Sequence, residues 1–360
     1  MKSIPNITSL RFFLAILVLL FHIPQFCEKH ELPFIVSYKS IPLFNRGVEA
    51  VFMFFSLSGF LIIRQLYLEK VERKTISLKK FFLRRILRIF PLYYLILTIG
   101  LLHYHVILPF FGFTFENNYN LVEGILLSIF FMPNIFADLY HPGGIIEVLW
   151  SIGIEEQFYL FIAPLLLVVP TSKIKKFLMF FTLLYLLLFF NDNFSFLRQF
   201  QMCFFYFSCS GFISLLLINK TTYKFEKQLK YLIYLLLLLY FTTDIFKDNF
   251  NPIQHHFFGM ILFGATLGTI SLKPIPLLES KLLNYLGSIS YGIYMYHAIV
   301  IQIVGFMYLK KLSTYNLSNE LSILIFYLLS IMLTISLAHF SYKYFEMFFL
   351  KMKKKYNYHS

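Results

Sequence analysis

Residues 7–26 read ITSLRFFLAILVLLFHIPQF, and this stretch decides the class of fold. A helix of about 20 mainly apolar residues crosses a bilayer core roughly 30 Å thick. Lys2 and the apolar core that follows it resemble a signal peptide, but the stretch has no small-residue cleavage site and contains Arg11 and His22. We therefore expect a retained membrane-spanning helix here.

Apolar stretches of this kind recur throughout the 360 residues. Apolar side chains make up 58% and charged ones 14%, where a soluble domain has roughly 45–50% and about 25%. The mean hydropathy is +0.70, and 47 Phe and 25 Tyr are too many for a water-facing surface. The composition excludes a soluble domain and predicts an all-α polytopic membrane protein. The three cysteines show no CxxC spacing, so neither a disulfide framework nor a thiolate metal site is expected.

Ten stretches can be drawn as spans, and their order suggests an orientation. With a cytoplasmic N-terminus, 25 of the 32 Lys and Arg residues lie on the inner side and seven on the outer side. The positive-inside rule therefore places both termini in the cytoplasm. Because the basic residues are divided among short loops, the expected partner is the lipid bilayer and not nucleic acid. The spans cover residues 8–27, 48–68, 90–110, 145–170, 177–191, 199–218, 230–247, 256–272, 283–309 and 319–346.

Residues 121–140 do not fit the pattern of a full span. They are apolar but are interrupted by Glu123, Gly124, Pro133 and Asn134. A full crossing here would put later basic loops on the outer side. We expect an interfacial or re-entrant segment on the outer side, since irregular backbone at membrane depth must be covered by protein or water.

The sequence shows no internal repeat at a fixed period, and no loop is long enough to form a soluble domain. We expect one integral-membrane domain over residues 1–347. Residues 348–360 would be a short basic cytoplasmic tail that acts as a juxtamembrane anchor.

Two ionisable residues share one face of the first predicted helix. Eleven steps of 100° bring His22 about 20° past three full turns from Arg11, and the two lie about 16 Å apart. An ionisable side chain inside a bilayer costs about 2.5–3.5 kcal/mol on insertion scales, so each one requires an explanation. A snorkelling arginine with a hydrogen-bonded structural histidine is one explanation, and a functional pair is the other.

An acidic pair lies within another span, where residues 150–159 read WSIGIEEQFY. Glu155 and Glu156 point about 100° apart, so at most one of them faces a given pocket. A carboxylate beside a histidine fixes its tautomer and raises its basicity, as a general base requires. Contact between one of these carboxylates and a histidine is therefore a hypothesis.

A basic segment over residues 79–91 reads KKFFLRRILRIFP and is assigned to a cytoplasmic loop. If it is helical, Arg84 and Arg88 stack on one face, with Arg85 beside them. Arginine forks suit bidentate phosphate binding. A membrane-insertion signal remains the alternative.

Two further segments combine small and polar residues. Residues 56–60 read SLSGF, which either permits close helix approach or places the Ser58 hydroxyl near a site. Residues 288–297 read SISYGIYMYH and put His297 inside a span. For His297, as for His103 and His105, we expect a structural or interfacial role.

Together these segments resemble the bacterial integral-membrane acyltransferase 3 family, whose members include O-antigen and other cell-surface O-acetyltransferases. Five family signatures occur in the family order and cover nearly the whole chain. The Gly-Val-Asp-x-Phe-Phe-x-x-Ser-Gly-Phe-Leu-Ile signature is met only approximately over residues 47–62, because Glu49 replaces the usual Asp and the spacing is looser. The other four are matched by Arg11 and His22; by Arg84, Arg85, Arg88, Ile89 and Pro91; by Trp150, Ser151, Glu155, Glu156, Gln157, Phe158 and Tyr159; and by Ser290, Tyr291, Tyr294 and His297.

The resemblance implies transfer of an acyl group, most often acetyl, from cytoplasmic acyl-CoA to a saccharide hydroxyl outside the bacterial inner membrane. His22 would deprotonate the hydroxyl or carry the acyl group, and Glu155 would orient His22. Acetyl-CoA would be the co-substrate, with no metal, and a homo-oligomer is compatible with the sequence. The phosphate contacts would come from Arg11, Arg84, Arg85 and Arg88. The remaining residues placed near the site are Ser58, Trp150, Ser151, Tyr159, Tyr291 and His297.

Two other classes of membrane protein also fit the composition. A transporter or flippase of a lipid-linked glycan would explain the buried charges, but it would usually show internal symmetry. A polysaccharide polymerase would normally need a large outer loop. Acetyl-CoA-dependent labelling of a surface glycan distinguishes the three.

Overall fold

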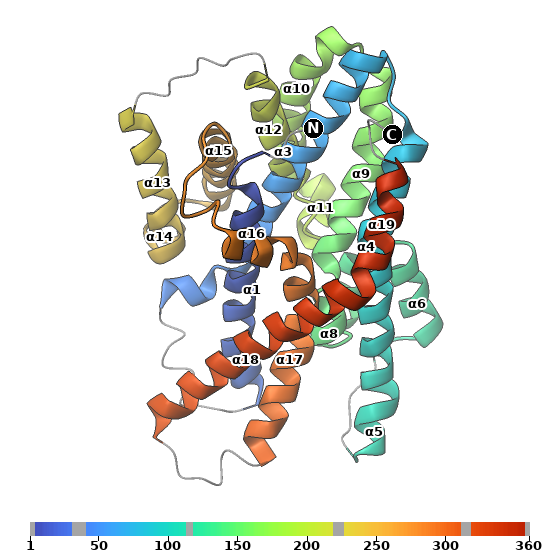
Figure 1. The fold of residues 1–360 in the computed structure, drawn as a ribbon, viewed down its shortest axis with the longest axis vertical. Coiled ribbons are helices and arrows are strands. Elements are labelled where there is room, and N and C mark those ends of the chain that lie inside the picture. Colours follow the sequence, from blue (N-terminus) through green and yellow to red (C-terminus); the bar gives the residue numbers. More distant parts are fainter. Residues whose placement is uncertain (1–3, 31–40, 113–117, 219–226, 311–317, 357–360) are drawn as a thin grey trace. The chain divides into compact units, whose positions relative to one another are not determined.

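The structure is a computed structural model that describes residues 4–30, 41–112, 118–218, 227–310 and 318–356. Throughout these ranges the regular elements are helices, and no strand occurs in them (Figure 1). The prediction of an all-α protein is confirmed.

Six helices in the described part of the chain are long and apolar enough to cross a membrane. A seventh span arises if two helical segments joined at a 94° bend, Thr171–Phe189 and Asp192–Gln199, cross together. The multi-pass prediction is confirmed at this level, while the count of ten spans and the orientation of the termini stay predictions. The six helices are Ile7–Lys29, Gly47–Arg73, Leu78–Phe110, Gly144–Val168, Ser290–Leu309 and Asn319–Lys353.

The individual helices follow one another with short connections. The first part of the chain forms α1 (Ile7–Lys29), α3 (Gly47–Arg73), α4 (Leu78–Leu102), α5 (Leu108–Phe110), α6 (Leu121–Ile129), α7 (Pro133–Tyr140), α8 (Gly144–Glu147) and α9 (Trp150–Val168). The second part forms α10 (Ile174–Phe189), α11 (Ser195–Gln199), α12 (Phe204–Leu216), α13 (Lys227–Thr242), α14 (Ile245–Asn249), α15 (Pro252–Ile270), α16 (Lys281–Ser288), α17 (Ser290–Lys310), α18 (Asn319–Ser341) and α19 (Met347–Lys353). Two π-helical turns, η3 (His103–Ile107) and η7 (Tyr342–Glu346), follow α4 and α18.

Two predicted boundaries are wrong. The arginines assigned to a cytoplasmic loop lie inside α4, because the helix begins at Leu78, where the Ser77 hydroxyl accepts a hydrogen bond from the backbone N–H of Lys80. The span drawn over residues 283–309 is two helices, since α16 ends at Ser288 and the chain turns at Ile289 before α17 begins. Small residues around this turn weaken the helix there, and the apolar periodicity did not reveal it.

Residues 121–140, the segment expected to be interfacial or re-entrant, form two helices with a break between them, as predicted. Helices α6 and α7 are joined through Phe131, whose φ of 58° ends the first helix. Its depth in the membrane stays a prediction.

The C-terminal tail is helical as far as the structure describes it. Helix α19 and the turn Lys354–Tyr356 pack on α4, and residues 357–360 lie outside the described ranges. The expected domain boundary between residues 347 and 348 stays a prediction.

The contacts divide the chain into two compact units. Unit 1 comprises Met1–Arg64, Leu178–Leu186 and Phe205–His339, and unit 2 comprises Gln65–Phe177, Leu187–Phe204 and Phe340–Ser360.

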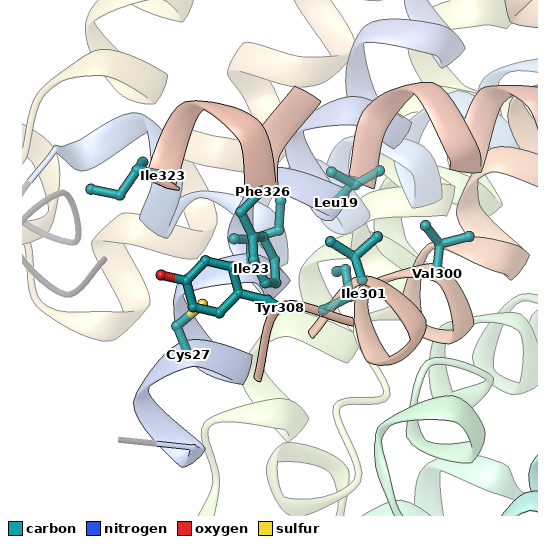
Figure 2. Close-up of a cluster of buried hydrophobic side chains, with 9 residues drawn as sticks. Leu19, Ile23, Cys27, Val300, Ile301, Tyr308, Ile323 and Phe326 are labelled. Carbon is teal, nitrogen blue, oxygen red and sulfur yellow. The ribbon is translucent and has the colours of Figure 1, made fainter. Parts of the chain in front are cut away.

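In unit 1, α1 packs against α16 and α17. Residues from the C-terminal half of α1 form an apolar cluster with residues of α17 and α18 (Figure 2). Because lipid tails are as apolar as these side chains, tight packing stabilises the contact more than burial itself does. The cluster fixes the part of α1 that carries His22. Its buried members are Leu19, Ile23, Cys27, Val300, Ile301, Val304, Tyr308, Ile323 and Phe326.

Two glycines allow backbones within unit 1 to approach closely. A Cβ on Gly287 would lie 1.9 Å from the carbonyl oxygen of Thr8, so no side chain fits where α16 crosses α1. A Cβ on Gly59 would lie 2.1 Å from the carbonyl oxygen of Phe207 on α12. The SLSGF segment therefore permits close helix approach, one of the two roles predicted for it.

In unit 2, side chains on α3, α4 and α9 donate hydrogen bonds to backbone carbonyl groups of neighbouring segments. The Tyr93 hydroxyl donates to the carbonyl of Ser128 at 2.8 Å, and the Gln157 side chain donates to the carbonyl of Phe131 at 2.7 Å. The Lys70 ammonium donates to three carbonyls at the C-terminal end of α9. A cation at this end of a helix satisfies carbonyls that have no intrahelical partner. These contacts fix the helices that carry the arginines and the acidic pair.

Candidate active site

The residues predicted from sequence form two groups, one in each unit. Imidazoles characterise the first group, and guanidinium and carboxylate groups characterise the second. Unit 1 holds Arg11, His22, Ser58, Tyr291 and His297. Unit 2 holds Arg84, Arg85, Arg88, Trp150, Ser151, Glu155 and Tyr159.

His22 is half-buried on α1 and has a defined tautomer. Its Nδ1 lies 2.9 Å from Oε1 of Gln25, one turn later on the same helix. Because an amide oxygen only accepts hydrogen bonds, Nδ1 carries the hydrogen and Nε2 keeps a lone pair. An imidazole in this state can accept a proton through Nε2, as a general base does.

The second membrane histidine lies directly against the first. The rings of His22 and His297 stack with their centroids 5.0 Å apart and their planes at 30°. His297 is fully buried, and its Nδ1 is hydrogen-bonded to the carbonyl oxygen of Tyr294. Its Nε2 has no hydrogen-bond partner in the described part of the chain. Sequence reasoning placed His297 near the site but expected a structural or interfacial role, and it gave no sign of this pairing.

The other predicted residues of unit 1 lie on the helices that surround this pair. Arg11 is half-buried on α1, Ser58 is half-buried on α3, and Tyr291 is half-buried on α17. Each of them interacts with neighbouring groups. Their predicted roles in a site stay predictions.

In unit 2, Arg84 is bound within the protein. Its side chain is only 3% exposed, and it forms an ion pair with Glu69 at 3.6 Å. It also donates to the carbonyl oxygen of Tyr356 at 2.8 Å. These contacts connect α3, α4 and the C-terminal turn, and they occupy part of the guanidinium that was predicted to bind phosphate.

Arg85 and Arg88 make fewer polar contacts within the protein than Arg84 does. The Arg85 guanidinium lies over the Tyr159 ring, 5.7 Å from the centroid, and its buried Nε has no partner among the described residues. Arg88 makes no hydrogen bond within the described ranges, although Glu155 and Glu346 lie near enough to interact with its charge. Both guanidinium groups therefore keep donors for a ligand.

The two glutamates of the acidic pair have different neighbours, as their angular separation requires. Glu155 accepts a hydrogen bond from the Tyr159 hydroxyl at 2.7 Å. Glu156 is 5% exposed, and its Oε1 has no partner among the described residues. His22 belongs to unit 1 and Glu155 to unit 2, so the contact hypothesised between them stays a prediction.

Trp150 and Ser151 begin α9, where the family signature starts. Ser151 is buried and Trp150 is half-buried, and both interact with neighbouring groups. Two residues later, a Cβ on Gly153 would lie 2.5 Å from the Pro133 ring. This part of the signature therefore seats the N-terminal part of α9 against α7.

Sequence reasoning missed several polar residues of the two groups. Gln25 could have been found, because residues three apart on a helix are neighbours. Glu69 and Glu346 gave no local signal: Glu69 reaches Arg84 from α3, and Glu346 is brought near Arg88 by the π-helical turn η7. The Ser341 hydroxyl donates to the Glu346 carboxylate at 3.2 Å. Such π-turns inside helices often occur at functional sites.

The described residues thus form a helical protein with several candidate membrane spans, a stacked pair of imidazoles and a cluster of arginines. Residues 4–340 match the acyltransferase domain that defines the acyltransferase 3 family. The chain belongs to this family, and the motif-based prediction of a membrane acyltransferase of the O-acetyltransferase kind is confirmed. No solved structure matches the chain.

Three relatives illustrate the range of the family. ORF330 of Acidianus two-tailed virus, assigned as an acetyltransferase, is 27% identical over 84% of this chain and 84% of its own length. A Staphylococcus aureus (strain COL) protein assigned as an O-acetyltransferase is 26% identical over 98% of this chain and 58% of its own. Peptidoglycan O-acetyltransferase OatA of Listeria monocytogenes is 27% identical over 46% of this chain and 25% of its own length. The chain thus spans only part of the two bacterial relatives.

Proposed function

We propose that the protein transfers an acetyl group from cytoplasmic acetyl-CoA to a hydroxyl of a cell-surface or lipid-linked saccharide, and that it works in a bacterial inner membrane. The observation that carries this proposal is the state of His22. Its Nδ1–H donates to Gln25, so Nε2 has a lone pair for the acceptor hydroxyl. The match of residues 4–340 to the acyltransferase family supports the reaction class.

In the proposed reaction, Nε2 of His22 takes the hydroxyl proton while the oxygen attacks the thioester carbonyl. The carbon–sulfur bond then breaks, and coenzyme A leaves as a thiolate. The imidazolium of His22 returns the proton to the sulfur, so the protons balance. The predicted alternative, in which His22 carries the acyl group, would form an acyl-enzyme instead.

The coenzyme phosphates are proposed to bind the arginines of α4. Arg85 and Arg88 are the main candidates, because within the described ranges neither guanidinium group is hydrogen-bonded to the protein. Arg84 would add positive charge nearby, and the contribution predicted for Arg11 stays a prediction. Charge-assisted hydrogen bonds to phosphate are short and about twice as strong as neutral ones. Glu155 is proposed to orient His22, the role predicted for it from sequence.

The test is labelling of surface saccharide in cells that express the chain. Wild-type cells fed labelled acetate should transfer label through acetyl-CoA to saccharide as alkali-labile ester. Cells with His22→Gln should lose the label, and cells with His255→Gln, a histidine that stacks on Tyr240 instead, should keep it. Absence of protein-dependent ester in wild-type cells would reject the proposal and favour a transporter or flippase.

A further inference from the structure

The stacked histidines support one inference about the acceptor substrate, and this inference rests on the proposed function. His297 is buried against His22, with the ring centroids 5.0 Å apart. The reaction proposed above uses His22 and leaves His297 without a role.

The tautomer of His297 follows from its hydrogen bond. Nδ1 is bonded to the carbonyl oxygen of Tyr294, and a carbonyl oxygen only accepts. The ring hydrogen therefore lies on Nδ1, and Nε2 holds a lone pair. His22 has the same tautomer, because its Nδ1–H donates to Gln25. Two stacked imidazoles thus each present an Nε2 that accepts hydrogen bonds and does not donate them.

The Nε2 of His297 is buried without a partner in the described part of the chain. Buried polar atoms in folded proteins nearly always have a hydrogen-bond partner, and each exception asks for an explanation. A group that donates a hydrogen, supplied by a bound substrate, would satisfy this atom. The group needed is a hydroxyl or an N–H, because another acceptor would repel the lone pair.

We infer that the acceptor substrate carries a second hydrogen-bond donor next to the reacting hydroxyl, and that Nε2 of His297 binds it. A 1,2-diol, as found on a sugar ring, has this chemistry. Its two hydroxyl groups are separated by one carbon–carbon bond, so one can meet His22 while its neighbour meets the adjacent ring. His297 forms no covalent bond and takes no proton, and it fixes which hydroxyl faces the base.

An acceptor with a single hydroxyl leaves the buried Nε2 of His297 unpaired when it binds. A site built to hydrogen-bond a substrate hydroxyl strongly rejects an analogue that lacks the group. The loss of one such hydrogen bond corresponds to a factor of about 5 to 150 in kcat/KM. The diol should therefore be preferred over the simple alcohol by a factor in this range.

The experiment compares trans-cyclohexane-1,2-diol with cyclohexanol as acceptors for the purified full chain in lipid nanodiscs with acetyl-CoA. Mass spectrometry measures the acetyl ester, and thiol release measures total turnover, including hydrolysis by water. The wild type should prefer the diol at least about 5-fold in kcat/KM. In His297→Phe, which keeps a ring against His22, the ratio should fall towards one. His255→Phe removes a stacked histidine elsewhere in unit 1 and should keep the wild-type ratio.

Each of the other outcomes would contradict either this inference or the proposed function. Equal wild-type rates with the two alcohols, or an unchanged ratio in His297→Phe, would overturn the inference. Thiol release to water without ester from either alcohol would overturn it too. If His297→Phe fails to fold, the wild-type ratio alone decides. Absence of thiol release from acetyl-CoA under every condition, native membranes included, would instead reject the proposed function.

Discussion

Replacing Arg88 with alanine should weaken acetyl-CoA binding and leave the protein folded. Within the described ranges Arg88 makes no hydrogen bond to the protein, so its removal leaves no hydrogen-bond partner unpaired, and the internal interaction that is lost is the attraction of its charge to Glu155 and Glu346. One charge-assisted contact to phosphate is worth about 1.5–3 kcal/mol, which corresponds to a roughly 10- to 150-fold rise in Kd. The unfolding midpoint should stay close to that of the wild type.

Arg84 is the matched contrast on the same helix. Its ion-pair partner Glu69 is 2% exposed, and Arg84 is 3% exposed. Arg84→Ala would leave the Glu69 carboxylate buried without its cation, and breaking such a pair costs about 3–5 kcal/mol. We therefore expect a large loss of stability from Arg84→Ala, with a smaller effect on coenzyme binding in the fraction that folds.

Calorimetric titration with acetyl-CoA and with 3′,5′-ADP, on protein in nanodiscs, measures the two affinities, and thermal unfolding measures stability. Arg88→Ala should weaken both ligands, since both carry phosphate. Arg88→Lys keeps the charge without the planar fork and should fall between Arg88→Ala and the wild type. If Arg88→Ala binds both ligands normally while Arg84→Ala folds normally and binds them poorly, the assignment of the phosphate contact is wrong.

Three further predictions concern packing, the acidic pair and topology. Gly59→Ala would put a Cβ 2.1 Å from a carbonyl oxygen of α12 and should cost about 1–3 kcal/mol in thermal unfolding; an unchanged midpoint would show that this approach is looser. Glu155→Gln should give acetyl transfer between the wild-type and His22→Ala rates, and full activity would remove its predicted role. A reporter after His359 should be cytoplasmic and one near Asn117 extracytoplasmic, both positions outside the described residues; the same side for both would refute the ten-span topology.

The class of fold and the reaction class could be predicted because their signals are local. Long apolar stretches specify membrane helices without any knowledge of their neighbours. The interruption at Phe131 was predictable from the polar and helix-breaking residues around it. The signatures that contain His22 and Glu155 are short segments, so their order along the chain was enough to indicate an acyltransferase.

The contacts between distant segments could not be predicted, because helix packing decides them. His297 meets His22 through the packing of α17 on α1, and periodicity within either helix gives no sign of it. The partner of Arg84 is a buried glutamate on another helix, so an arginine that matched a phosphate-site pattern is largely engaged inside the protein. The break at Ile289 was hidden because apolar residues continue on both sides.

The most direct test of the account is the rate of acetyl transfer by His22→Gln. Glutamine keeps polar contacts but cannot take up a proton near neutral pH, so it removes the base and spares much of the packing. A general base contributes about 10²–10⁴-fold to a rate. We predict that transfer from acetyl-CoA falls by at least about 100-fold while the Kd for acetyl-CoA stays at the wild-type value. Retention of more than about a tenth of wild-type transfer by the folded variant would contradict the assignment of His22 as the general base.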